Sequence, residues 1–261
     1  MGTPLKIAVT GKGGVGKTTV AALLCRALVD SGCSVIAVDA DPDANLGAAV
    51  GIRGDDTIVP LASMAALIEE RTGAAPGNVG SFFKINPHVA DLPEKLWQER
   101  DGIKLLKMGT VKQGGSGCIC PASAMLKAMI QNLVLYRNEA VIMDMEAGIE
   151  HLGRATAQAV NQLIVVVEPG MRSIETARTI RALAHDLKLD NICLIANKIR
   201  SQSDTDFIYE NADGLNVIGL LPFDDKLMQA DRLRLPAWEL CPEALALMRA
   251  ACTKIAPQPA D

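Results

Sequence analysis

The sequence predicts an α/β protein built on one doubly wound, mostly parallel β-sheet with helices on both faces. Three observations support this fold class. Short apolar runs alternate with longer helix-forming runs, which is the pattern of successive β-α-β units. A glycine-rich segment directly follows the first apolar run, and acidic or amide residues follow several later ones. Because ligands bind at the carboxyl ends of parallel strands, these polar residues are expected to meet at one site.

The glycine-rich segment, residues 11–19, lies between an apolar run at 5–9 and a helix-forming run at 18–29. This order is the context of a phosphate-binding loop. Glycines let backbone N–H groups turn towards an anion, and the helix N-terminus adds partial positive charge. Lys17 is expected to reach the β- and γ-phosphates, and the Thr18 hydroxyl to bind Mg²⁺. The residues expected to contact the nucleotide here are Gly13, Gly14, Val15, Gly16, Lys17, Thr18 and Thr19.

Two later apolar runs end in aspartates. Residues 34–39 lead into an acidic loop that contains Asp41, directly before a proline. A carboxylate near the γ-phosphate can polarise water or hold Mg²⁺ through water, although an Asp-Pro pair is also a common turn starter. Residues 140–145 contain Asp144 near their tip, with Gly148 four residues on. This pattern is typical of an acid that holds Mg²⁺ through water, followed by a movable switch.

Cys118 and Cys120 lie one residue apart in a glycine-rich loop, just before a helix expected at 122–136. Thiolates select Zn, Ni, Cu(I) or Fe–S species, but two ligands are too few for a closed tetrahedral site. A two-fold dimer axis nearby would bring four thiolates together. The alternatives are two small buried thiols or a redox pair, and the latter is weakened because so short a disulfide would be strained.

The remaining elements complete one domain spanning residues 1–261. Residues 52–100 are the least regular part, and we interpret them as an insertion within that domain. Asn197 follows a strand expected at 192–196, where its amide can donate to and accept from the adenine edge. The other expected strands are 82–85, 103–111, 162–167 and 217–221, and the other expected helices are 59–71, 173–187 and 242–255.

Composition excludes several classes of function. A net charge of −4 argues against non-specific binding to nucleic acid or anionic membranes. No apolar run reaches the roughly 18 residues of a membrane span, and no signal peptide precedes the first strand. We therefore expect a cytoplasmic protein. Its 7 cysteines are then expected to be thiols or metal ligands rather than a disulfide framework.

The loop at 11–19 resembles the deviant Walker A loop of the MinD/ParA/nitrogenase-iron-protein ATPases, which are P-loop NTPases of the SIMIBI class. The resemblance implies hydrolysis of ATP to ADP within an ATP-dependent homodimer, with Lys12 reaching the phosphates of the partner subunit. It further implies that Asp41 orients the attacking water and that Asn197 binds adenine. The segment that begins at Pro222 resembles the second adenine-flanking loop of this class.

Within that class, the chain is most similar to the CooC-type ATPases that mature nickel carbon monoxide dehydrogenase. The resemblance covers nearly the whole chain and rests on residues 11–19, 39–43, 108–120, 144–151 and 168–170. It implies that paired Cys118 and Cys120 residues bind Ni²⁺, or Zn²⁺, at the dimer interface. The implied partner is carbon monoxide dehydrogenase, which would receive nickel for its nickel–iron–sulfur cluster.

Three alternatives remain open. A maturation ATPase for a related nickel enzyme, such as acetyl-CoA synthase, would have similar motifs. A MinD/ParA-type positioning ATPase would share the phosphate-binding loop, but it needs a membrane helix or a basic DNA-binding face. An electron-transfer iron protein resembling nitrogenase reductase would space its two cysteines far apart, unlike Cys118 and Cys120.

Overall fold

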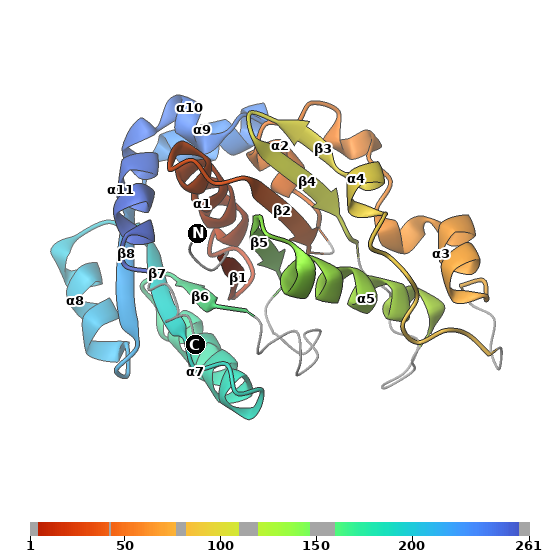
Figure 1. Ribbon diagram of the computed structural model, residues 1–261. Coiled ribbons are helices and arrows are strands. Elements are labelled where there is room, and N and C mark those ends of the chain that lie inside the picture. The colour runs from red at the N-terminus through yellow and green to blue at the C-terminus, as the bar shows by residue number, and fades with distance from the viewer. Residues whose placement is uncertain (1–4, 42, 77–81, 110–119, 147–159, 256–261) are drawn as a thin grey trace.

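A computed structural model of the chain describes residues 5–41, 43–76, 82–109, 120–146 and 160–255. Its described strands form a single sheet in the order β3-β4-β2-β5-β1-β6-β7-β8 (Figure 1). Every neighbouring pair is parallel except β3 with β4. The strands are β1 (Lys6–Gly11), β2 (Val35–Ala40), β3 (Gln98–Arg100), β4 (Ile103–Lys107), β5 (Ala140–Met145), β6 (Gln162–Val167), β7 (Ile192–Ile199) and β8 (Asn216–Pro222).

Helices cover both faces of this sheet, which confirms the predicted doubly wound fold. Successive strand residues point to opposite faces, so Ile7 and Val9 join one hydrophobic cluster while Ala8 joins the other. The helices are α1 (Lys17–Asp30), α2 (Leu46–Ala49), α3 (Ala65–Thr72), α4 (Pro93–Leu96), α5 (Pro121–Tyr136), α7 (Met171–Asp186), α8 (Gln202–Asn211), α9 (Asp225–Leu233), α10 (Ala237–Leu240) and α11 (Pro242–Cys252), with 3₁₀ turns η1 (Asp55–Thr57) and η2 (Leu61–Ser63).

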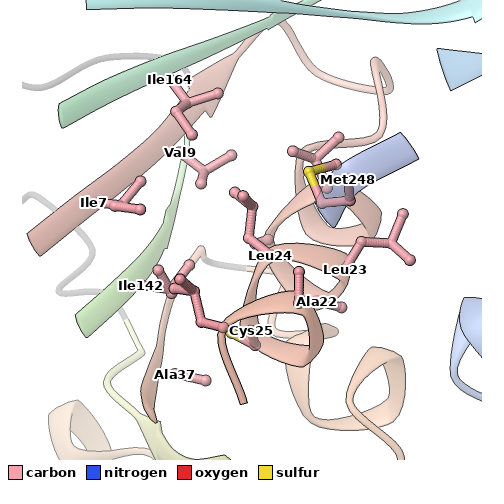
Figure 2. Packing of buried hydrophobic residues seen from close by; sticks show 14 of the residues in the cluster. Ile7, Val9, Ala22, Leu23, Leu24, Cys25, Ala37, Ile142, Ile164 and Met248 are labelled. Atoms are coloured by element: carbon pink, nitrogen blue, oxygen red, sulfur yellow. The ribbon is translucent and has the colours of Figure 1, made fainter. Parts of the chain in front are cut away.

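Each face has its own core. On one face, α1 packs against the central strands β1 and β5 and against α11. Met248 of α11 lies near Leu23 of α1 (Figure 2). On the other face, α3, α5, α7 and α8 bury their apolar sides in a second cluster. None of the described helices is both long enough and apolar enough to cross a bilayer.

The insertion-like segment differs most from expectation. The helix predicted at 59–71 is divided into η2 and the shorter α3, because Pro60 and Met64 take non-helical backbone angles at the two N-caps. The strand predicted at 82–85 is wrong, and Phe82 there is fully exposed. Ile68 and Leu92 nevertheless join the same cluster as α5. The assignment of residues 1–261 to one domain stays a prediction.

An edge hairpin was missed by the sequence reasoning. Strand β3 pairs with β4 through the two-residue turn Asp101-Gly102, whose φ angles are 50° and 82°. Asp-Gly is a favoured pair for such turns because both positions need positive φ. The strand predicted at 103–111 begins correctly and ends at Lys107, while residues 110 and 111 lie outside the described ranges.

Lys6 joins the first strand to the end of α5. Its buried ammonium donates hydrogen bonds to the carbonyl groups of Leu133 at 3.3 Å, Arg137 at 2.6 Å and Glu139 at 2.8 Å. The last carbonyl groups of a helix lack partners within the helix and favour a nearby cation. Lys6 therefore caps α5 from the neighbouring strand.

We predict that Lys6→Met lowers the free energy of unfolding by roughly 2–3 kcal/mol, since three carbonyl groups lose their donor in a buried setting. Urea unfolding should show a lower midpoint with an unchanged slope. Lys127→Met, at an exposed position of the same helix, should change the midpoint little. Equal midpoints for the two variants would contradict the capping role.

Candidate nucleotide site

The glycine-rich loop connects β1 to α1 and requires glycine at two kinds of position. Gly14 and Gly16 have φ angles of 81° and 95°, which side chains other than hydrogen disfavour. A Cβ added to Gly16 would lie 2.3 Å from Nδ2 of Asn197, and one added to Gly11 would lie 2.4 Å from the carbonyl oxygen of Val166. The loop thus lies directly against the neighbouring strands, while Gly13 and Gly14 face open space.

Lys17 and Asp41, both predicted as site residues, come together at the start of α1. The Lys17 Nζ lies 3.9 Å from Oδ2 of Asp41, and their side chains are only 8% and 16% exposed. The backbone N–H of Asp43 donates to the other Asp41 oxygen at 3.0 Å. This arrangement places the Asp41 carboxylate beside the ammonium that is expected to hold the terminal phosphates.

Asp144 and Asp39 lie side by side on β5 and β2, where they are register partners. Both side chains are fully buried. Asp39 accepts a hydrogen bond from the N–H of Leu46 at 3.0 Å. Its other oxygen, and both oxygens of Asp144, lack a hydrogen bond of normal geometry to the described residues.

Burial disfavours the ionised forms of Asp39 and Asp144, and their pKa values rise as a result. Burial raises the pKa of Asp144 to about 7; the charges of Asp39 and Asp41 add to the rise, while Thr18 and Lys17 oppose it. Burial likewise raises the pKa of Asp39 to about 6. Buried carboxylate oxygens without partners are unfavourable unless a cation or water satisfies them. The residues present therefore fit a hydrated Mg²⁺ between Thr18 and Asp144.

An open cleft of about 560 Å³ extends from the loop towards α9, within the size range of small-molecule sites. Leu227 and Met228 of α9 provide apolar surface at its far end, beside Phe223. The guanidinium of Arg200 stacks on the Phe223 ring at 3.5 Å from its centroid. The predicted residues that line this cleft are Gly13, Gly14, Gly16, Lys17, Thr18, Thr19, Asp41, Asn197 and Pro222.

Asn197 lines the cleft but already contacts the loop. Its Nδ2 donates to the carbonyl of Val15 at 2.8 Å, and its Oδ1 accepts from the N–H of Lys198 at 2.9 Å. Contact of Asn197 and Pro222 with adenine stays a prediction. Lys198 and the two apolar residues of α9 were missed by the sequence reasoning; the position of Lys198 directly after Asn197 was the one available signal.

Lys12 and the cysteine pair are placed only in part. Lys12 is partly exposed at the mouth of the loop, and no described residue forms an ion pair or hydrogen bond with its ammonium. Cys120 is the N-cap of α5, where its sulfur accepts from the N–H of Ser123 at 3.5 Å. Cys118 lies outside the described residues. Within the described ranges, no group of three or more acidic, histidine or cysteine side chains could hold a metal ion.

Comparisons with known proteins agree with this geometry. The family model of the CobQ/CobB/MinD/ParA nucleotide binding domain matches residues 6–236. The chain is 46% identical over 259 residues to the carbon monoxide dehydrogenase accessory protein CooC of Rhodospirillum rubrum, covering 97% of this chain and 98% of that protein. It is also 46% identical over 235 residues to an uncharacterized ATP-binding protein of Methanocaldococcus jannaschii, covering 89% and 90% of the two chains.

Solved structures share the fold at lower identity. The MinC:MinD cell division complex of Aquifex aeolicus gives a TM-score of 0.68 at 21% identity, covering 99% of this chain and 98% of that one. A ParA family ATPase from Chlorobium tepidum gives 0.68 at 17% identity, covering 97% and 98%. The family match and the nearly full-length identity show that the chain belongs to the CobQ/CobB/MinD/ParA nucleotide-binding family, as an ATPase of the CooC type.

Proposed function

We propose that this chain is an ATP-dependent metallochaperone that binds nickel at a dimer interface and inserts it into carbon monoxide dehydrogenase. The observation that carries the proposal is the 46% identity, over nearly the full length of both chains, to a protein named as a carbon monoxide dehydrogenase accessory protein. The Cys118-Ile119-Cys120 sequence supplies the thiols that such a role needs. We expect the protein to act in the cytoplasm, without binding nucleic acid or membrane.

The geometry of the site supports the nucleotide-dependent part of this mechanism. The loop amides and Lys17 bind the phosphates, and Thr18 with Asp144 would hold Mg²⁺, which neutralises phosphate charge when bound. Asp41 lies beside Lys17, where its carboxylate can orient a water molecule towards the γ-phosphate. In the nucleotide complex, the phosphate would take the place of the Asp41 carboxylate beside Lys17, which frees Asp41 to act on that water.

Metal binding is expected to be thermodynamically coupled to ATP-dependent dimerisation. If Lys12 contacts the nucleotide of a partner subunit, ATP stabilises the dimer. A dimer brings two copies of Cys118 and Cys120 together, which supplies the four thiolates of a tetrahedral site. By reciprocity, nickel or zinc bound there must also stabilise the dimer. Hydrolysis would then weaken the dimer and release the metal to the client enzyme.

Two alternative functions share the ATPase activity but differ in the client enzyme or in the cellular role. A related nickel enzyme such as acetyl-CoA synthase would require the same nucleotide and metal chemistry, so only reconstitution with each apo-enzyme separates them. A MinD/ParA-type positioning role is less favoured because the chain is acidic overall. Co-sedimentation with liposomes or plasmid DNA in the presence of ATP tests that role.

We predict that a non-hydrolysable ATP analogue raises the affinity for Ni²⁺ and Zn²⁺. Cys118→Ser combined with Cys120→Ser should abolish this uptake, lowering affinity by ~100-fold or more, since even an outer-shell change costs ~10–100-fold. Native mass spectrometry with metal titration measures both the dimer and its metal content. Cys33→Ser, at an exposed cysteine, is the control. Undiminished uptake by the double variant would contradict the site.

Lys12→Gln should separate nucleotide binding from dimerisation. We expect the variant to bind ADP as the wild type does, while its dimer fraction with the ATP analogue falls ~10-fold or more because an interfacial charge-assisted contact is lost. Light scattering at matched concentrations measures the dimer. Lys17→Gln, by contrast, should weaken nucleotide binding itself. An unchanged dimer in Lys12→Gln would contradict the partner-reaching role.

The buried acids predict a pH dependence of stability without metal. Because the pKa of folded Asp144 is about 7, against 3.8 ordinarily, the folded state holds a proton that the unfolded chain releases between those values. Unfolding free energy from this group therefore falls as pH rises through that window. In EDTA, Asp144→Asn should be more stable than the wild type at pH 8 by roughly 2–4 kcal/mol.

The stability difference between this variant and the wild type should shrink as the pH falls, to about 1 kcal/mol near pH 4.5. It should vanish only below the ordinary pKa of 3.8, where Asp144 is protonated in both the folded and the unfolded state. The variant's ATPase activity should be lost at every pH, because an amide is a poor partner for hydrated Mg²⁺. Asp190→Asn removes an exposed carboxylate and should follow the wild-type stability curve. A pH-independent stability difference between Asp144→Asn and the wild type would argue against a buried, proton-binding Asp144.

A further inference from the structure

Two consecutive residues near the end of β7 donate hydrogen bonds to carbonyl groups of the phosphate-binding loop. Asn197 donates to the carbonyl of Val15 at 2.8 Å, and the Lys198 ammonium donates to the carbonyl of Gly14 at 2.7 Å. The two contacts therefore fall on consecutive peptide groups of the loop. They come from residues more than 180 positions away in the sequence, separated by 182 and 184 residues respectively.

A hydrogen bond to a carbonyl group also fixes the direction of the N–H group of the following residue, which belongs to the same peptide unit. A trans peptide unit is planar, so its C=O and N–H point in opposite directions. A donor on the Gly14 carbonyl therefore turns the Val15 N–H away from Lys198 and into the turn of the loop, where it donates to the Lys12 carbonyl at 3.4 Å. A donor on the Val15 carbonyl likewise turns the N–H of Gly16 away from β7. Phosphate loops bind anions through such inward-facing amides.

The backbone of Lys198 is specialised for this contact. Its φ angle is 61°, a left-handed conformation that is uncommon outside glycine. The register between β7 and β8 shifts between Ala196 and Ile199, so Lys198 lies in an irregular part of the strand. Its N–H donates to its neighbour's side chain, Oδ1 of Asn197, which stabilises the turn.

Glu168 completes the arrangement from the neighbouring strand. Its Oε2 lies 2.8 Å from the Lys198 ammonium, and the two side chains are 30% and 39% exposed. A pair so exposed contributes little to global stability. It does fix the direction of a long, flexible side chain whose other contact is the loop carbonyl. Glu168 belongs to a sequence feature, residues 168–170, that the proposed mechanism leaves without a role.

We propose that Lys198 is a positioning residue for nucleotide binding: held by Glu168, its ammonium fixes the Gly14 carbonyl and so sets the shape of the loop whose amides bind the phosphates. The proposal concerns nucleotide binding and does not depend on the metal cargo. It also assigns Asn197 a second contact, on the loop, that is separate from the expected one with adenine.

The test measures ADP affinity by calorimetry and steady-state ATPase kinetics in four variants. Lys198→Met keeps the length of the side chain without its donor and should weaken ADP binding about tenfold, the effect of losing one charge-assisted hydrogen bond. The KM for ATP should rise similarly while kcat stays within about threefold, because the loop binds ground and transition states alike. Lys198→Arg, which retains donors, should restore most of the affinity.

Glu168→Gln separates positioning from simple charge attraction. If Lys198 acted only as a positive charge near the phosphates, removing the adjacent carboxylate would tighten ADP binding. The positioning role instead predicts binding about two- to threefold weaker, because an amide holds the ammonium less firmly. Lys188→Met is the matched control, since Lys188 is an exposed lysine that shares the positive φ of Lys198, at 60°. It should change neither the ADP affinity nor the KM for ATP.

Two results would overturn the proposal. The first is ADP affinity in Lys198→Met within twofold of the wild type. The second is tighter ADP binding in Glu168→Gln. Thermal unfolding of each nucleotide-free variant, expected within a few degrees of the wild type because these side chains are partly exposed, confirms that any loss of affinity arises in the folded protein.

Discussion

The structure depends on the need to turn consecutive backbone amides of one loop towards an anion. Each inward N–H leaves a carbonyl on the opposite side of the loop, and each such carbonyl needs its own donor. Asn197 and Lys198 of β7 meet this need, which is possible because β6 and β7 follow β1 in the sheet. The close approach also explains why Gly16 tolerates no Cβ. The sheet order is thus part of the phosphate site.

On the other side of the loop, the sheet order concentrates negative charge. Strand β5 adjoins β1, and β2 adjoins β5 on its other side, which brings Asp39 and Asp144 into register as buried neighbours. Burial favours the protonated acids, as their raised pKa values show. A bound cation would favour the ionised forms instead. The site therefore retains groups that are unfavourable in the nucleotide-free protein, as expected where binding residues are selected for function over stability.

The parallel sheet, the phosphate-binding loop and the aspartates at the strand ends could be predicted from the sequence, because each depends on a pattern of a few adjacent residues. Strand 140–145 and strand 162–167 were predicted to the residue. The bracing of the loop could not be predicted in this way, since Lys198 and Gly14 are 184 positions apart. The strand predicted at 82–85 failed because an apolar run alone does not distinguish a strand from an exposed segment. The β3–β4 hairpin, by contrast, had a readable Asp-Gly signal.

A series of contacts behind the cleft connects the acidic strands with α9. Asp39 holds the N–H of Leu46 at the start of α2, and the buried Asp55 beyond α2 pairs with Arg234, which ends α9. Gly47 of α2 packs so closely on Asp55 that a Cβ there would lie 2.6 Å from the Asp55 Cβ. Packed interfaces of this kind shift as units rather than deforming continuously, so a movement of the segment after Asp39 is expected to reach α9, which lines the same cleft. Contacts on both sides of the cleft are therefore parts of one arrangement.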